Sequence, residues 1–300
     1  MRRRRFKNLS CLKNSEPADI FLALSHNVFI MTIDAEVHFW KYGKATGATP
    51  IRNNKIMQED YLPSGISLNL QRNRVDACIA VAAEPAEVET RFLAELALTH
   101  PVIRAVIGWI DLKEKNAGER IEKLSAYTAI KGFKLDVSGE NFFPSEDVMQ
   151  ALAQHSFALD LKLSSDTNTP QLNDRIRSYP DQHFVLEQCG SPDAKQPPSA
   201  SWIQQIRQLA KNQNLFCKVS GLFTLSTWKS WKPADFYPFL DTLFEAFGPE
   251  RLLYASDWPF ILLSGSYVQW KSLLEKYTER MSEEDKENFF GKNAVRIYPL

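Results

Sequence analysis

Residues 75–83 read Val-Asp-Ala-Cys-Ile-Ala-Val-Ala-Ala, and residues 84–99 continue as Glu-Pro-Ala-Glu-Val-Glu-Thr-Arg-Phe-Leu-Ala-Glu-Leu-Ala-Leu-Thr. The first stretch is short and almost continuously apolar, which is typical of a parallel β-strand buried on both faces. The second stretch places apolar residues three and four positions apart, as an amphipathic helix does. Together they predict one strand followed by one helix.

This pair of elements recurs along the chain. Eight short apolar runs, whose starts are 26 to 43 residues apart, lie at residues 32–39, 75–83, 102–111, 130–137, 157–163, 183–188, 215–220 and 252–257. Helical patterns lie between them at residues 84–99, 145–154, 171–178, 201–211 and 235–247. Eight units with no change of composition predict a single α/β domain over residues 31–300, a (β/α)8 TIM barrel, and favour it over an open doubly wound sheet.

The first thirty residues differ from the rest of the chain. A basic run, Arg2 to Arg5, precedes a short apolar stretch at residues 20–24. A targeting segment would have this outline, but the apolar stretch is interrupted and no clear cleavage site follows. We therefore favour an N-terminal extension over residues 1–30 that is disordered or precedes the natural start at Met31.

Composition excludes several classes of function. Lys and Arg together number 36, as do Asp and Glu, so the chain has no net charge with which to attract nucleic acid or an anionic membrane. No apolar run approaches the roughly 20 residues of a membrane span. The four cysteines form no close cluster, which favours a reduced, cytoplasmic setting. The chain also has no G-x-S-x-G elbow, P-loop or dinucleotide-binding glycine motif.

In a TIM barrel the reactive side chains lie at the carboxyl ends of the strands. The first strand ends with Glu36 and His38, which are two residues apart and therefore share a face. The fourth strand carries Lys134, the sixth ends at Gln188, and the eighth ends at Asp257. Asp is depleted in strands and costly to bury unpaired, so Asp257 is the leading catalytic candidate, with capping of the following turn as the alternative.

His38 is the one histidine of five that the sequence places at a carboxyl end of a strand. Several tryptophans also lie near strand ends or in the loops that follow, among them Trp40, Trp109 and Trp258. With Gln188 they are the candidates for substrate binding; for the tryptophans, packing between barrel and helices is an equal alternative. Residues 41–63 form a long loop expected over this end of the barrel, with a surface insertion as the alternative, and residues 63–65 are expected to form a turn.

Seven motifs follow one another along the chain: Ile33-Asp34-Ala35-Glu36-Val37-His38-Phe39-Trp40, Gly108-Trp109-Ile110-Asp111-Leu112, Lys131-Gly132-Phe133-Lys134, residues 184–193, Cys217-Lys218-Val219-Ser220-Gly221-Leu222, Ala255-Ser256-Asp257-Trp258-Pro259 and residues 289–294. Together they resemble the amidohydrolase superfamily. The sequence is most similar to the amidohydrolase-related branch, which includes sugar-lactone hydrolases and pyrone-dicarboxylate lactonase. The resemblance implies a hydrolase of carbohydrate metabolism that opens a sugar lactone or a related cyclic ester.

Two positions depart from the family pattern. The first strand of the family normally reads His-x-His, and here Glu36 occupies the first of those positions. The sixth strand normally ends Asp-His, and here the pair is Glu187-Gln188. Lys134 stands where the family usually has arginine, so a positive charge is kept without the bidentate fork of a guanidinium.

Three interpretations of this altered site follow. In the first, no metal is required: Asp257 is the base for water attack, and His38 and Lys134 polarise the carbonyl. In the second, Glu36, His38 and Asp257 weakly bind one divalent metal, Zn²⁺ or Mn²⁺. In the third, the barrel has lost catalysis and binds a small molecule or a protein. The expected partner is a small sugar-lactone-like substrate, and a homo-oligomer is left open.

Overall fold

The structure is a computed structural model, which describes residues 31–43, 54–139 and 141–300. Residues 31–300 form one unit. The predictions for residues 1–30, including the extension, and for part of the long loop after the first strand lie outside the described residues. Among the residues that are described, no helix has the length and apolar character needed to cross a bilayer.

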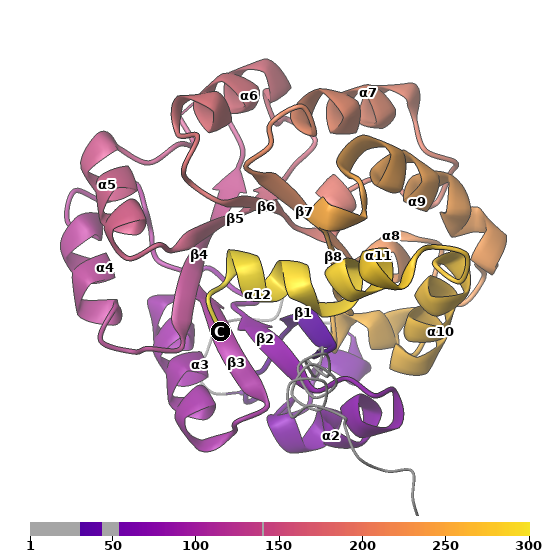
Figure 1. The fold of residues 1–300 in the computed structure, drawn as a ribbon. Helices are drawn as coiled ribbons and strands as arrows, with labels where there is room; N and C mark the ends of the chain where they lie inside the picture. Colours follow the sequence, from indigo (N-terminus) through magenta and orange to yellow (C-terminus); the bar gives the residue numbers. More distant parts are fainter. Residues whose placement is uncertain (1–30, 44–53, 140) are drawn as a thin grey trace, which may run out of the picture. The chain divides into compact units, whose positions relative to one another are not determined.

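Eight parallel strands form one sheet in sequence order, as Figure 1 shows. They are β1 (Ile33–Val37), β2 (Ala77–Val81), β3 (Ile103–Gly108), β4 (Ile130–Val137), β5 (Ala158–Leu163), β6 (Phe184–Leu186), β7 (Leu215–Val219) and β8 (Leu252–Tyr254). All eight predicted strands are present, and the observed strands are equal to or shorter than the predicted runs. The predicted (β/α)8 barrel is therefore confirmed.

The barrel closes between its first and last strands. Val37 forms an isolated parallel bridge with Trp258, just beyond β8. The amide of His38 donates to the carbonyl of Trp258 at 2.7 Å, and the amide of Asp257 donates to the carbonyl of Glu36 at 3.0 Å. These bonds place the chain after β8 against the carboxyl end of β1.

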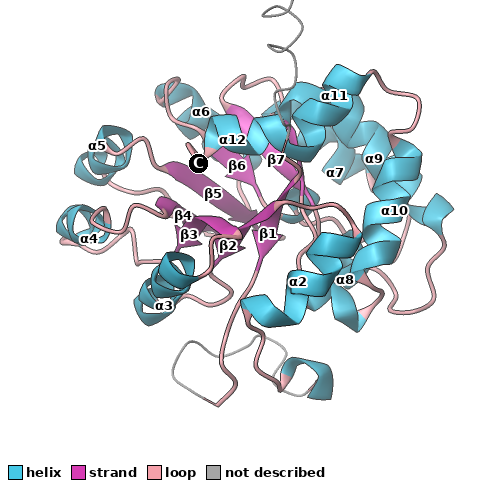
Figure 2. Cartoon of the chain, turned by 60° about the horizontal axis from the view of Figure 1, so that its bottom comes forward, coloured by secondary structure: helices cyan, strands magenta, loops and turns pink. Residues whose placement is uncertain are grey.

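Most of the helices lie on the outer side of the sheet (Figure 2). The helices are α2 (Pro63–Arg72), α3 (Glu87–Thr99), α4 (Ala117–Leu124), α5 (Glu146–Gln154), α6 (Thr169–Ser178), α7 (Ala200–Leu209), α8 (Leu222–Leu225), α9 (Pro233–Phe247), α10 (Tyr267–Tyr277), α11 (Glu283–Glu287) and α12 (Asn293–Ile297). The expectation of a turn at residues 63–65 is wrong, because these residues begin α2. Proline is favoured at the first helical position, where its missing N–H needs no partner.

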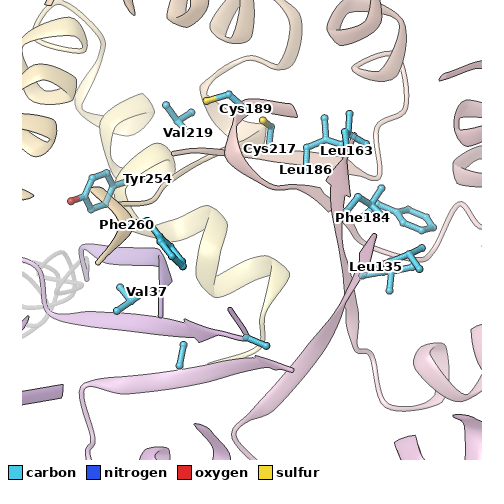
Figure 3. Close-up of a cluster of buried hydrophobic side chains, with 14 of the residues drawn as sticks. Val37, Leu135, Leu163, Phe184, Leu186, Cys189, Cys217, Val219, Tyr254 and Phe260 are labelled. Carbon is cyan, nitrogen blue, oxygen red and sulfur yellow. The ribbon is translucent and has the colours of Figure 1, made fainter. Parts of the chain in front are cut away.

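Two hydrophobic cores support this architecture. One fills the space between strands and helices and includes Val37, Leu135 and Phe184 (Figure 3). The other lies inside the barrel, where small side chains such as Ala35 and Ala77 pack with Tyr298, just after α12. In Figure 1 α12 crosses one end of the barrel. The interior is thus packed at this end, and the carboxyl ends of the strands are left for polar groups.

Gly132 of β4 is required by the close approach of β5. A Cβ atom at this position would lie 2.4 Å from the carbonyl oxygen of Ala158, a backbone atom that cannot move aside. We expect Gly132→Ala to lower the free energy of unfolding by about 1–3 kcal/mol, the usual cost of overpacking. Urea unfolding followed by circular dichroism measures this change.

Gly118 provides the matched control. It lies in α4, and a Cβ atom there would meet nothing within 4 Å. Gly118→Ala should therefore raise the free energy of unfolding by about 0.5–1 kcal/mol, since alanine is the better helix former. Equal midpoints for the two variants would contradict the proposed clash.

Candidate active site

Barrel closure brings three of the predicted site residues together. His38 Nε2 lies 3.4 Å from Asp257 Oδ1 and 3.7 Å from Glu36 Oε1. Glu36 belongs to β1, His38 follows it, and Asp257 follows β8. All three side chains are buried. The imidazole thus lies between two carboxylates from opposite ends of the chain.

Each of these side chains is oriented by a further contact. His38 Nδ1 lies 2.8 Å from the carbonyl oxygen of Val81 at the end of β2, which directs Nε2 towards the carboxylates. The hydroxyl of Ser220 donates to Glu36 Oε2 at 2.5 Å. Asp257 accepts hydrogen bonds from Gln188 at 3.2 Å and from Thr224 at 3.0 Å.

The backbone around Gln188 and Asp257 is adapted to this arrangement. Asp257 has a φ of +59°, in the left-handed region that residues with a side chain seldom adopt. Gly221 also has a positive φ, and a Cβ atom there would lie 2.8 Å from the Cβ of Gln188. Glycine at position 221 therefore leaves the space that Gln188 needs to reach Asp257.

Two atoms of this cluster are available as ligands for a metal ion. Glu36 Oε1 and His38 Nε2 are buried and have no hydrogen-bond partner in the described part of the chain. Ligand atoms of Glu36, His38 and Asp257 all lie within 4.8 Å of one another. Two ligands of a tetrahedral zinc ion at about 2.1 Å are about 3.4 Å apart, close to the separations found here. The residues therefore fit a divalent metal with three protein ligands.

Glu36, His38 and Asp257 shift one another's pKa values. Burial alone would lower the pKa of His38, but Asp257 and Glu36 outweigh it and raise this pKa to about 9. Burial would raise the pKa of Glu36, yet His38 and Lys218 lower it to about 2. Burial raises the pKa of Asp257 above its usual range. Both carboxylates therefore favour the protonated imidazole, and a metal ion bound at Nε2 would replace that proton.

Lys134 is also at this end of the barrel, where it pairs with a carboxylate outside the cluster of Glu36, His38 and Asp257. Its ammonium lies 3.1 Å from Glu187 Oε2 and donates to the carbonyl of Ala82 at 2.9 Å. Burial acts to lower the pKa of Lys134, and the charges of Glu187 and Glu36 raise it. Glu187 rather than Glu36 is therefore the contacting carboxylate that neutralises Lys134.

A second buried ion pair lies beside Lys134 and was not predicted. Lys218 of β7 contacts Asp160 of β5 at 2.6 Å and lies 3.9 Å from Glu187. Tyr298 donates to both oxygens of Asp160, at 2.8 and 3.0 Å. Alternation along the strands could have indicated that Lys218 and Asp160 face inwards, but not that they pair.

The predicted substrate-binding residues occupy different environments. Trp40 and Trp258 are each 2% exposed and pack edge to face against the ring of Tyr61, a contact that fits the packing alternative. Trp109 is half-buried, and its backbone amide donates to the hydroxyl of Thr90 at 2.7 Å. Gln188 contacts Asp257 directly. Substrate contact by these four residues stays a prediction.

The other histidines and the cysteines that the structure describes contribute no ligand atom to this cluster. His100 and His155 follow the last residues of α3 and α5, His183 precedes β6, and His26 is outside the described residues. Cys78, Cys189 and Cys217 are buried free thiols, and burial raises the pKa of each. Their environment favours a packing role over reactivity.

Comparison with known proteins assigns the family. A model of the amidohydrolase family matches residues 33–300. The chain belongs to the amidohydrolase family. Among its relatives, the L-fucono-1,5-lactonase of Burkholderia multivorans is 30% identical over 287 residues, which cover 90% of this chain and 96% of that protein.

Solved structures agree with this assignment. A crystal structure of an amidohydrolase from Burkholderia multivorans with bound zinc has a TM-score of 0.80 and 30% identity, covering 90% of this chain and 99% of that one. A putative 2-pyrone-4,6-dicarboxylic acid hydrolase from Pseudomonas putida has a TM-score of 0.67 at 16% identity, covering 90% and 98% of the two chains. The second likeness supports the fold alone.

The candidate metal centre gives a direct binding prediction. We expect the protein to bind one zinc ion per chain, and His38→Ala to weaken binding by more than the 10–100-fold typical of losing an outer partner. Isothermal titration with zinc and elemental analysis after dialysis measure this. His155→Ala is the control, because that ring contacts Glu122 and not the site. Unchanged zinc affinity in His38→Ala would refute the assignment.

The buried Lys218–Asp160 pair gives a stability prediction. Lys218→Met removes the only cation that contacts Asp160 among the described residues, so an uncompensated buried carboxylate remains. We expect the free energy of unfolding to fall by about 3–5 kcal/mol in urea. Adding Asp160→Asn should recover part of this loss, since asparagine is uncharged and still accepts from Tyr298. A double variant no more stable than Lys218→Met would contradict the explanation.

Proposed function

We propose that this protein is a hydrolase that opens a lactone of a sugar acid by water attack at the site formed by Asp257, His38 and Lys134. The observation that carries the proposal is the convergence of a buried carboxylate of raised pKa and an imidazole at the carboxyl ends of the strands, 3.4 Å apart. The similarity to L-fucono-1,5-lactonases at 30% identity supports this substrate class.

Asp257 is the proposed general base. A carboxylate whose pKa is raised by burial accepts a proton from water more readily than an exposed aspartate does. The water oxygen then bonds to the lactone carbonyl carbon while its proton passes to Asp257. When the ring C–O bond breaks, the leaving oxygen takes that proton, so the product is the open hydroxy acid and the base is restored.

His38 and Lys134 are the proposed electrophilic groups. Lys134 supplies a positive charge that can stabilise the oxyanion formed at the carbonyl oxygen. His38 presents Nε2 to the same centre, because its Nδ1 is directed to the carbonyl of Val81. A divalent metal bound by Glu36, His38 and Asp257 would supply further polarisation of the carbonyl or of the attacking water.

A lactone is a suitable substrate for these groups. Its ring ester is more reactive than an amide, so a carboxylate base and one ammonium can support the reaction. Hydrolysis of a neutral lactone also releases an acid, and the product carboxylate would meet the buried Asp257 and Glu36. Repulsion between these like charges would assist product release.

The decisive experiment is hydrolysis of L-fucono-1,5-lactone and related aldonolactones, followed by a pH indicator, in wild type and Asp257→Asn. Removing a general base should lower kcat by about 10²–10⁴-fold and leave KM within a few-fold. Asp174→Asn, an exposed position on α6, should behave as wild type. Full turnover in Asp257→Asn would exclude Asp257 as the base, and binding without turnover in wild type would favour a non-catalytic barrel.

A further inference from the structure

The residues that leave β2 contact both electrophilic groups of the proposed site. The carbonyl of Val81 lies 2.8 Å from His38 Nδ1, and the next carbonyl, that of Ala82, accepts from Lys134 at 2.9 Å. Two consecutive peptide groups therefore contact His38 and Lys134, respectively. A contact that fixes the orientation of one of these peptides also fixes the side chain that is bonded to it.

The peptide between Ala82 and Ala83 is fixed from its other side by Glu89. The amide of Ala83 donates to Glu89 Oε1 at 2.8 Å, and the amide of Glu84 donates to Glu89 Oε2 at 2.9 Å. Glu89 lies in the first turn of α3 and is 1% exposed. Both oxygens of its carboxylate thus accept hydrogen bonds from the short segment that joins β2 to α3.

One peptide plane connects Glu89 with Lys134. The Ala82 carbonyl and the Ala83 amide belong to the same trans peptide, so they point in opposite directions and rotate together. An acceptor that holds the N–H in place therefore also aims the carbonyl at the ammonium. The negative charge on the N–H side additionally polarises the carbonyl that Lys134 meets.

We propose that Glu89 is a positioning residue for Lys134, acting through the Ala82–Ala83 peptide. Its importance for turnover rests on the proposed lactone hydrolysis, whereas its effect on the place of Lys134 does not. Glu89 touches no reacting atom, so its effect on turnover should appear chiefly through the position of Lys134.

His38 supplies an internal comparison. The peptide that contacts it, between Val81 and Ala82, has its N–H bonded to the carbonyl of Ile107 at 2.9 Å, in the neighbouring strand β3. The anchor of His38 therefore belongs to the sheet and is independent of Glu89. Loss of Glu89 should disturb Lys134 and leave His38, and zinc binding with it, unchanged.

A purely structural explanation would treat Glu89 as a capping group of α3. Glutamate at the third helical position often bonds back to the backbone before the helix. Burial, however, raises the pKa of Glu89 to about 7, although the hydrogen bonds from the two amides and the charges of His38 and Lys134 act to lower it. A cap at an exposed helix end needs no such burial, and perturbed carboxyl groups gather at functional sites.

The test compares Glu89→Gln with wild type in a double-mutant cycle with Lys134→Met. Glutamine offers one acceptor oxygen where two amides need one each, so the peptide loses one of its anchors. We expect Glu89→Gln to lower kcat for the aldonolactone about 10–100-fold, the effect of a small misplacement of a catalytic group. In the Lys134→Met background the same change should alter kcat less than about 3-fold, because coupled groups are not additive.

Two further variants separate positioning from stability. Glu89→Asp keeps both acceptor oxygens and should retain more activity than Glu89→Gln. Gln182→Leu removes a buried side chain that bonds two backbone carbonyls at the amino ends of β5 and β6, away from the site. It should lower the urea midpoint without changing kcat per folded molecule.

Crystal structures and zinc titration of Glu89→Gln keep the test independent of the substrate. We expect the Ala82 carbonyl to turn away from Lys134, with the His38–Val81 contact and the zinc affinity unchanged. An unchanged Lys134–Ala82 distance, or an equal fall of kcat with and without Lys134, would overturn the proposal. Absence of lactone turnover in wild type would refute the proposed function, while the structural comparison would still decide the role of Glu89.

Discussion

Closure of the barrel between β1 and β8 is the constraint on which the site depends. The two backbone hydrogen bonds that join residues 36–38 to residues 257–258 set the register of the last strand against the first. Asp257 and Glu36 are 221 positions apart in the sequence, yet this register brings both within 3.7 Å of the same imidazole nitrogen. A shift of one residue would turn Asp257 to the opposite face. The unusual φ of Asp257 shows that the backbone at this junction is held by its surroundings.

The pairing of buried charged side chains is a second constraint on the site. The charged side chains of the site form two groups of contacts: His38 with Glu36 and Asp257, and two lysines with two carboxylates, namely Lys134, Lys218, Glu187 and Asp160. Such groups are tolerated away from water only when they are paired. When all four carboxylates are ionised, the two lysines balance Glu187 and Asp160, and the negative excess remains on Glu36 and Asp257. That excess lies beside the unpartnered atoms of Glu36 and His38, and it favours binding of a cation there.

The fold could be predicted from the sequence, and candidates for the site could be selected, because both depend on local patterns. Apolar runs at regular spacing identify strands, and the carboxyl-end rule then selects Glu36, His38, Lys134 and Asp257. Which charged side chains pair depends on the register between strands and on how far each side chain reaches. The sequence of a single strand contains neither. For this reason the contact of Lys134 with Glu187, and the bonds from Glu89 to the segment after β2, could not be predicted. Pro63 was misread because proline is common both in turns and at the first position of a helix.

The two departures from the family pattern alter the site in different ways. Glu36 replaces a neutral ligand with an anion, so it can still bind a metal, and it also raises the pKa of His38. Gln188 cannot ionise or serve well as a ligand, but its amide donates to Asp257 Oδ1 and so favours the ionised form of that carboxyl. Burial and the charge of Glu36 act in the opposite direction on Asp257. Burial and the contacts with His38 and Thr224 also act on this carboxyl, so the pKa of Asp257 reflects the whole cluster, and the two substituted positions influence it in opposite directions.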